Sequence, residues 1–117
     1  MTDFIREIPS DSTVQKIEIE NGNLTVYFNF DIEVNGKIVG AVVFENIEAI
    51  ELLPGWQGEG SVEGIAIKGS SALLEKTKNI LKEDDESEDL INSLKSYQIG
   101  ASEKPFIEII AQSHLVK

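Results

Sequence analysis

The sequence contains no cysteine, and it is poor in other residues that carry chemistry. Without cysteine the chain has no disulfide, no thiolate nucleophile and no cysteine-ligated metal or iron–sulfur site. Its single histidine, His114, is the only candidate for a histidine-based general base. No pattern places a serine and a carboxylate beside His114, so we expect a structural role for it. The sequence therefore predicts no assignable catalytic residue, no cofactor and no metal site.

Basic residues are also scarce. Ten lysines and arginines face 21 aspartates and glutamates, which gives a formal net charge of −11. Such a field repels phosphate backbones and anionic lipid headgroups, so we expect neither nucleic acid nor a membrane as a partner. A basic protein partner is compatible with this charge, and the simpler explanation is that the charge keeps the protein soluble.

Long apolar runs are missing as well. No segment approaches the roughly 20 apolar residues of a membrane-spanning helix. Residues 1–7 show neither the basic start nor the apolar run of a secretory signal. Together with the absence of cysteine, these features predict a cytoplasmic protein.

The patterning of the 117 residues, 41% of them hydrophobic, predicts one folded domain over residues 1–117. Apolar and polar residues alternate strictly from Leu24 to Val34, which predicts a half-buried strand. Asn-Gly dipeptides at 21–22 and 35–36 flank this strand, and they favour type I′ hairpin turns. Residues 14–45 are thus predicted to form a three-stranded antiparallel meander.

The two-residue turns also predict the strand register. The expected facing pairs are Ile19–Leu24, Ile17–Val26, Ile32–Val39, Phe30–Ala41 and Phe28–Val43. This register places Ala41 and Val43 on the core face of the third strand. Its other face, with Ile38, Val42 and Phe44, is apolar too, and we expect another part of this chain to cover it rather than a partner.

The remaining sequence predicts further strands and two helices. Strands are expected over 47–53, with a bend or bulge at Glu45–Asn46, over 61–68, and over 106–111 after Pro105. Apolar residues at helical spacing predict helices over 71–82, capped by Ser70 or Ser71, and over 86–98. The expected fold class is α+β: an antiparallel sheet, made of the N-terminal three-stranded meander plus further strands and a C-terminal strand, with two helices packed on it.

Acidic residues gather in two tracts. Six acids in seven positions join the predicted helices: Glu83, Asp84, Asp85, Glu86, Glu88 and Asp89. This run lacks the ligand spacing and the glycine of an EF-hand loop, which favours a solvated linker or an acidic docking surface over a specific cation site. The second tract, residues 38–67, has no base and contains Glu45, Glu48, Glu51, Glu59 and Glu63. Two of these glutamates would be needed by a carboxylate-based hydrolase, which is an alternative function.

Trp56, the only tryptophan, lies in the loop predicted over residues 54–60. A large amphipathic ring there either packs over the core or forms an aromatic anchor with an acidic rim. The predicted partner-binding residues are Trp56, Glu59, Glu63, Glu83, Asp84, Asp85, Glu86, Glu88 and Asp89. The sequence thus favours a non-enzymatic protein-binding module that contacts a basic protein. The alternative is a structural or ligand-binding module; both a monomer and a homodimer fit the sequence.

Two apolar segments add a resemblance. The run Val42–Leu52, VVFENIEAIEL, together with the late strand Phe106–Ala111, is similar in style to small bacterial immunity proteins of polymorphic toxin systems. Such proteins neutralise a cognate toxin by binding it, often over its active site. The resemblance implies an inhibitor that neutralises a basic toxin or enzyme through an acidic surface, and it assigns no role to an individual residue.

Overall fold

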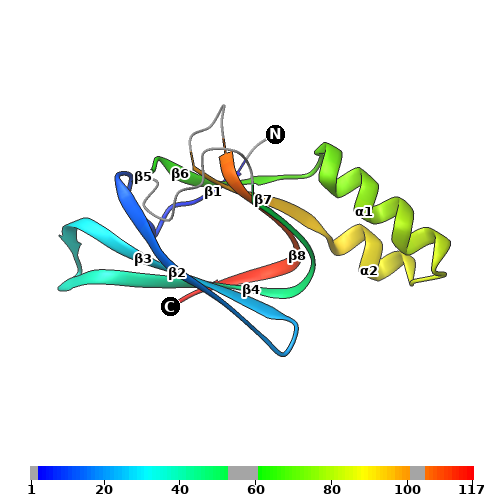
Figure 1. Cartoon of the computed structure of the whole chain (residues 1–117), viewed down its shortest axis with the longest axis horizontal. Coiled ribbons are helices and arrows are strands. Elements are labelled where there is room, and N and C mark those ends of the chain that lie inside the picture. The colour runs from blue at the N-terminus through cyan, green and yellow to red at the C-terminus, as the bar shows by residue number, and fades with distance from the viewer. Residues whose placement is uncertain (1–2, 53–60, 101–104) are drawn as a thin grey trace.

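The computed structural model describes residues 3–52, 61–100 and 105–117, and these form eight strands and two helices. The strands are β1 (Asp3–Ile5), β2 (Ser12–Glu20), β3 (Asn23–Val34), β4 (Lys37–Leu52), β5 (Ser61–Val62), β6 (Gly64–Lys68), β7 (Lys95–Gly100) and β8 (Pro105–Val116). The helices are α1 (Ala72–Glu83) and α2 (Glu88–Ser93). The α+β class with an antiparallel sheet is confirmed. Figure 1 shows both helices at one end of a curled sheet and the β3–β4 hairpin at the other.

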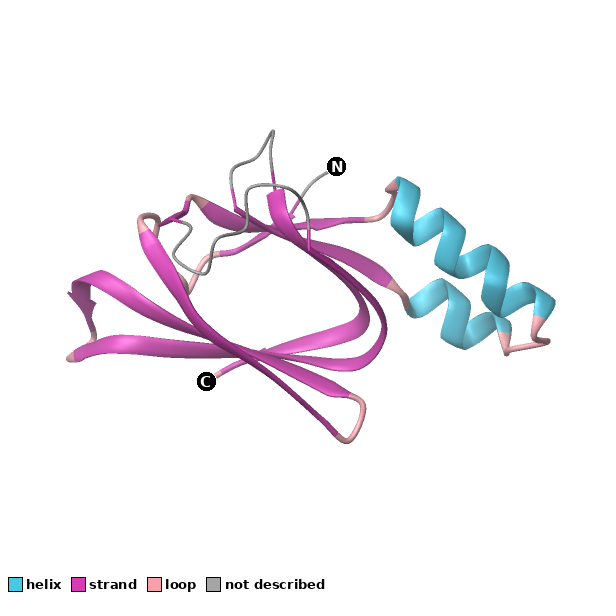
Figure 2. Cartoon of the chain, viewed as in Figure 1, coloured by secondary structure: helices cyan, strands magenta, loops and turns pink. Residues whose placement is uncertain are grey.

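The described strands form one antiparallel sheet in the order β1-β6-β7-β8-β4-β3-β2-β5. Only Glu63 separates β5 from β6, yet β5 pairs with β2 whereas β6 pairs with β7. One stretch of chain therefore reaches both sides of the sheet, which curls round until it meets itself (Figure 2). This arrangement protects strand edges that would otherwise expose unpaired backbone groups.

A bend in the long strand β4 helps the sheet to curl. This strand pairs with β3 through its first half and with β8 through its second half. Asn46 has a φ of 56°, and the register against β8 shifts between Ile47 and Ala49. Such a bulge bends a strand and increases its twist, and asparagine tolerates positive φ better than most residues. The bend predicted at Glu45–Asn46 is confirmed, but the strand expected over 47–53 is the continuation of β4.

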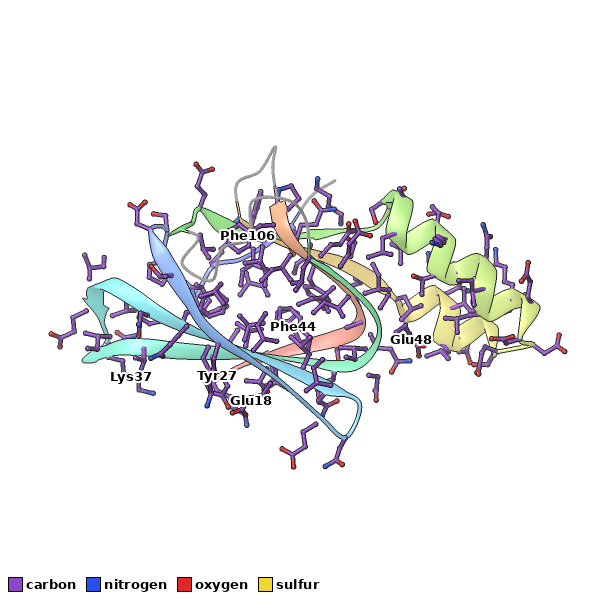
Figure 3. All side chains as sticks on the ribbon, viewed as in Figure 1. Glu18, Tyr27, Lys37, Phe44, Glu48 and Phe106 are labelled. Carbon is purple, nitrogen blue, oxygen red and sulfur yellow. The ribbon has the colours of Figure 1, made fainter. Side chains whose placement is uncertain are left out.

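The main hydrophobic core fills the inside of the curled sheet. Tyr97, Phe28 and Phe44 are its largest fully buried side chains, and Figure 3 shows Phe44 and Phe106 pointing inward. The rings of Phe44 and Tyr97 meet edge to face, with centroids 4.9 Å apart. His114 lies next to them, its Nδ1 3.1 Å from the Tyr97 hydroxyl oxygen. The single histidine thus packs against the core.

The first hairpin of the meander has the predicted register. The second keeps it beside the turn, where Val34 faces Lys37, but the register shifts between Asn29 and Val34, so the three predicted pairs of this hairpin are wrong. Ala41 faces Tyr27 instead of Phe30. The Phe30 ring lies over Gly40, where a Cβ would be only 2.5 Å from Cζ of that ring. The missing side chain of Gly40 makes room for the ring and allows the shifted pairing. Near the hairpin end Ile32, which was expected in the core, is 64% exposed.

Strand β4 is consequently turned over relative to the prediction, because the register moves by an odd number of residues. Val42 and Phe44 are fully buried in the core, whereas Ala41 and Val43 lie half-buried on the outer face. The expected intramolecular cover of the face with Ile38, Val42 and Phe44 is confirmed for Val42 and Phe44, which the main core buries, whereas Ile38 is 63% exposed. Among the described elements, α1 meets β4 further along the strand, at Ala49.

The second helix is shorter than predicted. It ends at Ser93, and most of the residues expected in its C-terminal half form β7. This strand pairs with β6 and β8, and it buries Tyr97 and Ile99. Backbone pairing on both sides, together with this burial, outweighs the helical spacing of the apolar residues. The first predicted helix is confirmed as α1, within a residue at each end.

Three further outcomes concern the ends and the loop. The predicted C-terminal strand is confirmed as β8, which runs on to Val116. The short strand β1, which pairs with β6, has no counterpart in the prediction. The loop over 54–60, with Trp56, lies outside the described residues. No helix in the described part of the chain is long and apolar enough to cross a membrane.

Candidate functional site

The six acids within residues 83–89, which span the end of α1, the turn and the start of α2, form one exposed surface, here called the acidic tip. Its residues are Glu83, Asp84, Asp85, Glu86, Glu88 and Asp89, all of them exposed. The tip lies at the end of the helix pair that points away from the sheet (Figure 1). The molecule is 45 Å long, so the tip stands well apart from the β3–β4 hairpin.

The turn at the acidic tip has a defined backbone structure. Helix α1 ends in a Schellman motif: Glu86 N–H donates to the Leu81 carbonyl at 3.1 Å, and Asp85 N–H donates to the Lys82 carbonyl at 3.2 Å. Asp85 takes the left-handed position of this motif, with a φ of 59°. Ser87 then caps α2 by accepting from Leu90 N–H at 3.2 Å. The acids are therefore presented on an ordered turn.

A buried hydrogen-bond network holds the base of the helix pair on the sheet. Ser71 caps α1 by accepting from Leu74 N–H at 3.0 Å, and its own hydroxyl donates to Oε2 of Glu108 at 2.5 Å. Ser96 on β7 donates to the same oxygen at 2.6 Å, and Gln98 Nε2 donates to the Ser96 hydroxyl at 3.3 Å. Glu108 is only 8% exposed, and the Ser71 and Ser96 hydroxyls supply hydrogen-bond donors to its carboxyl group. The network fixes where α1 leaves the sheet.

Apolar packing completes the attachment of the helices. A second core cluster, separate from the main core, contains Leu74, Leu81, Ile91, Leu94 and Ile110. Four of these residues belong to the helix region and Ile110 to the outer side of β8. Burying an aliphatic side chain of this size contributes about 1.5–3 kcal/mol. The acidic tip is thus carried by a packed element rather than by a free linker.

Two pockets flank the acidic tip. One, about 380 Å³, lies between α1 and β4 and is lined by Glu48, Ala49, Leu73, Lys76, Thr77, Ile80, Leu81 and Asp84. The other, about 430 Å³, is lined by Lys82, Asp85, Glu86, Glu88, Ile91 and Asn92. The first combines apolar residues with two carboxylates, Glu48 and Asp84, and one base, Lys76; Ile80 in it is 49% exposed. Apolar contact and negative charge therefore occur side by side.

Glu48 connects the sheet to the acidic tip electrostatically. Its pKa is raised, first by partial burial and then by the nearby charge of Glu86. Figure 3 shows Glu48 on the stretch of β4 nearest the helices. A raised pKa means that the negative charge of this carboxylate is disfavoured where it lies.

The structure brings six of the nine predicted partner-binding residues together, namely those of the acidic tip. Glu63 is exposed but lies between β5 and β6, at the end of β6 remote from α1. Trp56 and Glu59 lie outside the described residues.

The described glutamates among those considered for a hydrolase are dispersed, and Glu59 lies outside the described residues. Glu45 accepts from the Ser113 hydroxyl at 3.2 Å, and Glu51 is an exposed residue that faces Glu108 across β4 and β8. Of the described glutamates of that tract, only Glu48 lines a pocket beside the tip.

Two residues of this surface were not predicted to belong to it. Ile80 has helical spacing with the buried residues of α1, so it was expected on the packed face. Glu48 lies 35 positions before Glu83, and no local pattern links the two positions. Only the packing of α1 against β4 brings Glu48 to the tip.

Comparisons with other proteins give no family for this chain. No family model, no curated protein and no solved structure matches it.

Proposed function

We propose that this chain is a non-enzymatic protein-binding module that attaches its acidic tip to a basic surface of another protein. The observation that carries the proposal is the exposed, ordered run from Glu83 to Asp89, flanked by pockets with apolar and acidic linings. In the form that the immunity-protein resemblance implies, the partner is a basic toxin or enzyme, which the chain neutralises by occupying its surface.

Electrostatics supports the attachment at the tip. Six exposed carboxylates within seven residues concentrate part of the net charge of −11 at one end of the molecule. Such a patch speeds diffusional encounter with a basic partner, and it gives association a strong dependence on ionic strength. Lys82 lies beside the tip, so the patch is not uniformly negative and favours a partner with a matching pattern of charges.

The pocket between α1 and β4 supplies the short-range contact. A basic residue with a long aliphatic stem fits it, because the stem covers Ile80 and Leu81 while the charged end reaches Glu48 and Asp84. Burial of apolar surface then slows dissociation, which charge alone does not achieve at physiological salt.

A pair of charge-matched variants tests the proposal. The tip variant carries Glu83→Gln, Asp85→Gly and Glu86→Gln; the control variant carries Glu20→Gln, Glu33→Gln and Glu63→Gln. Both remove three exposed acids, so both have the same net charge. The probe is an amphipathic peptide of lysine and leucine at helical spacing, titrated by calorimetry at low and physiological salt.

We expect the tip variant to bind the peptide about tenfold more weakly than the control variant, since exposed charge pairs contribute about 0.5 kcal/mol each. Equal weakening in both variants would mean that only net charge attracts the peptide, and the proposed site would be wrong. The same pair then serves to select the natural partner: a host protein retained by the control variant and lost by the tip variant binds the tip.

A further inference from the structure

A second surface lies on the outer face of the sheet, remote from the acidic tip. Across β3 and β4, Tyr27 faces Ala41 and Asn29 faces Val39, so the side chains of Tyr27, Ala41 and Val39 lie close together. They form part of a pocket of about 470 Å³, lined by Gln15, Tyr27, Lys37, Val39, Gly40, Ala41 and Lys117. Figure 3 shows Tyr27 and Lys37 on the outside of the sheet, away from Glu48.

The floor of this pocket is apolar and open. Val39 is 49% exposed, and Tyr27 and Ala41 are half-buried. The helices of the described chain pack elsewhere, so they do not cover this face. An open apolar floor bordered by polar groups is the usual anatomy of a small-molecule site, and 470 Å³ lies within the usual size range of such sites, roughly 300–1,000 Å³.

The rim of the pocket is basic, which is unusual in this acidic chain. Lys37 and Lys117 line it, and Lys16 Nζ lies 4.8 Å from the centroid of the Tyr27 ring. Lys16 is neutralised by Glu18, whose carboxylate lies 2.7 Å away and also accepts from the Tyr27 hydroxyl. In the described part of the chain, neither Lys37 nor Lys117 forms a salt bridge.

The backbone keeps Lys117 at the pocket. Its N–H donates to the Ala41 carbonyl at 2.8 Å, and its carbonyl accepts from Ala41 N–H at 3.4 Å. Lys37 is held by the hairpin, since it faces Val34 in the strand pairing. Two ammonium groups therefore border one apolar floor. The acidic tip is too far away to cancel their field, because charges more than about 8 Å apart are screened at physiological salt.

We propose that this pocket binds a small apolar carboxylate, such as a medium-chain fatty acid. The hydrocarbon chain lies on Tyr27, Val39 and Ala41, and the carboxylate lies between the ammonium groups of Lys37 and Lys117. The carboxamide of Gln15 at the rim offers a further hydrogen bond. Charge complementarity selects an anion, and the small size of the floor selects one short chain rather than a lipid surface.

The test is a ¹⁵N NMR titration of the whole chain with octanoate. Octyltrimethylammonium has the same alkyl chain with the opposite charge, and acetate has the same headgroup without the chain. We expect saturable shifts at the amides of Tyr27, Val39 and Ala41 with octanoate alone. Lys37→Gln should weaken octanoate binding about threefold, as loss of an exposed charge pair does. Lys78→Gln, on α1, removes the same charge outside the pocket and should leave the affinity unchanged.

Three results would overturn this inference. Equal shifts with octyltrimethylammonium would show an apolar surface without selection for anions. Octanoate shifts that never saturate, or that centre on the helices, would show nonspecific contact. The third result is a dimer. If sedimentation reveals a dimer that octanoate does not dissociate, and the shifts at Val39 and Ala41 depend on dimer formation, the face binds a second copy of the chain.

Discussion

Replacing Ser71 by alanine probes how the helix pair is fixed to the sheet. The Ser71 hydroxyl serves two partners at once: it accepts from Leu74 N–H at 3.0 Å and donates to the buried Glu108 carboxylate at 2.5 Å. Alanine removes both bonds without adding volume. Glu108 then keeps the Ser96 hydroxyl as a donor at 2.6 Å, so its charge is left only partly satisfied.

The magnitude follows from the two contributions. Loss of an N-cap side chain costs about 1 kcal/mol, and loss of a hydrogen bond to a buried charge costs about 2 kcal/mol. We therefore expect Ser71→Ala to lower the free energy of unfolding by about 3 kcal/mol. The matched control is Ser87→Ala, because Ser87 caps α2 by a bond to Leu90 N–H but is exposed and bonds to no carboxylate. It should cost about 1 kcal/mol.

Urea denaturation, followed by far-ultraviolet circular dichroism, measures both variants. A double-mutant cycle isolates the carboxylate bond: in a Glu108→Ala background, Ser71→Ala should cost only the cap, about 1 kcal/mol. Equal costs for Ser71→Ala and Ser87→Ala in the unaltered chain would refute the reasoning. So would a cost of Ser71→Ala that stays the same when Glu108 is absent.

Four further predictions concern the tip, pH and the backbone. Asp85→Gly should raise the free energy of unfolding by about 1 kcal/mol in urea denaturation, because glycine adopts the left-handed C-cap position without strain. Because the pKa of Glu48 is raised, the folded state still holds a proton at pH values just above 4.5, where the unfolded state has lost it. The free energy of unfolding should therefore fall as the pH rises above 4.5. The urea midpoint of Glu48→Gln should exceed that of the unaltered chain at pH 7 and match it below about pH 4. Gly100→Ala should lower the free energy of unfolding by about 2 kcal/mol or more. Gly100 has a φ of 133°, and a Cβ there would lie 3.0 Å from the Phe106 nitrogen. Thermal unfolding measures the loss. Burial raises the pKa of Tyr97 to about 12, so the folded state keeps a proton that the unfolded state loses near pH 10. The free energy of unfolding should therefore fall as the pH rises from about 10 to about 12. In urea denaturation at alkaline pH, Tyr97→Phe should show a smaller decrease over this range.

Local signals in the sequence were sufficient for several elements. Asn-Gly at 21–22 and the alternation from Leu24 onward predict the first hairpin and its register, because turn type and pleat are properties of neighbouring residues. The helix α1 follows from the same kind of signal, which leaves the cap open between Ser70 and Ser71; in the structure Ser71 is the cap. The acidic run of the tip was predictable as well, since its six acids lie within seven consecutive positions and need no folding to be brought together.

Other features depend on residues far apart in the chain. The register of β4 was mispredicted because Gly40 leaves room for the Phe30 ring, and an odd shift then turns the whole strand over. The stretch that forms β7 has helical spacing, yet pairing with β6 and β8 makes it a strand. In both cases hydrogen bonds and burial supplied by distant strands exceed the small local preferences of the residues concerned.

The same division applies to the two proposed sites. By itself the sequence determined the charge, the exposed acids and the apolar character of β4. Three features were decided by the tertiary structure alone. Glu48 lies beside the acidic tip. Glu108 accepts hydrogen bonds from the hydroxyls of Ser71 and Ser96. Lys37 and Lys117 border an uncovered apolar floor. The physical reason is that sheet closure and helix docking set distances between residues tens of positions apart, and no local pattern encodes those distances.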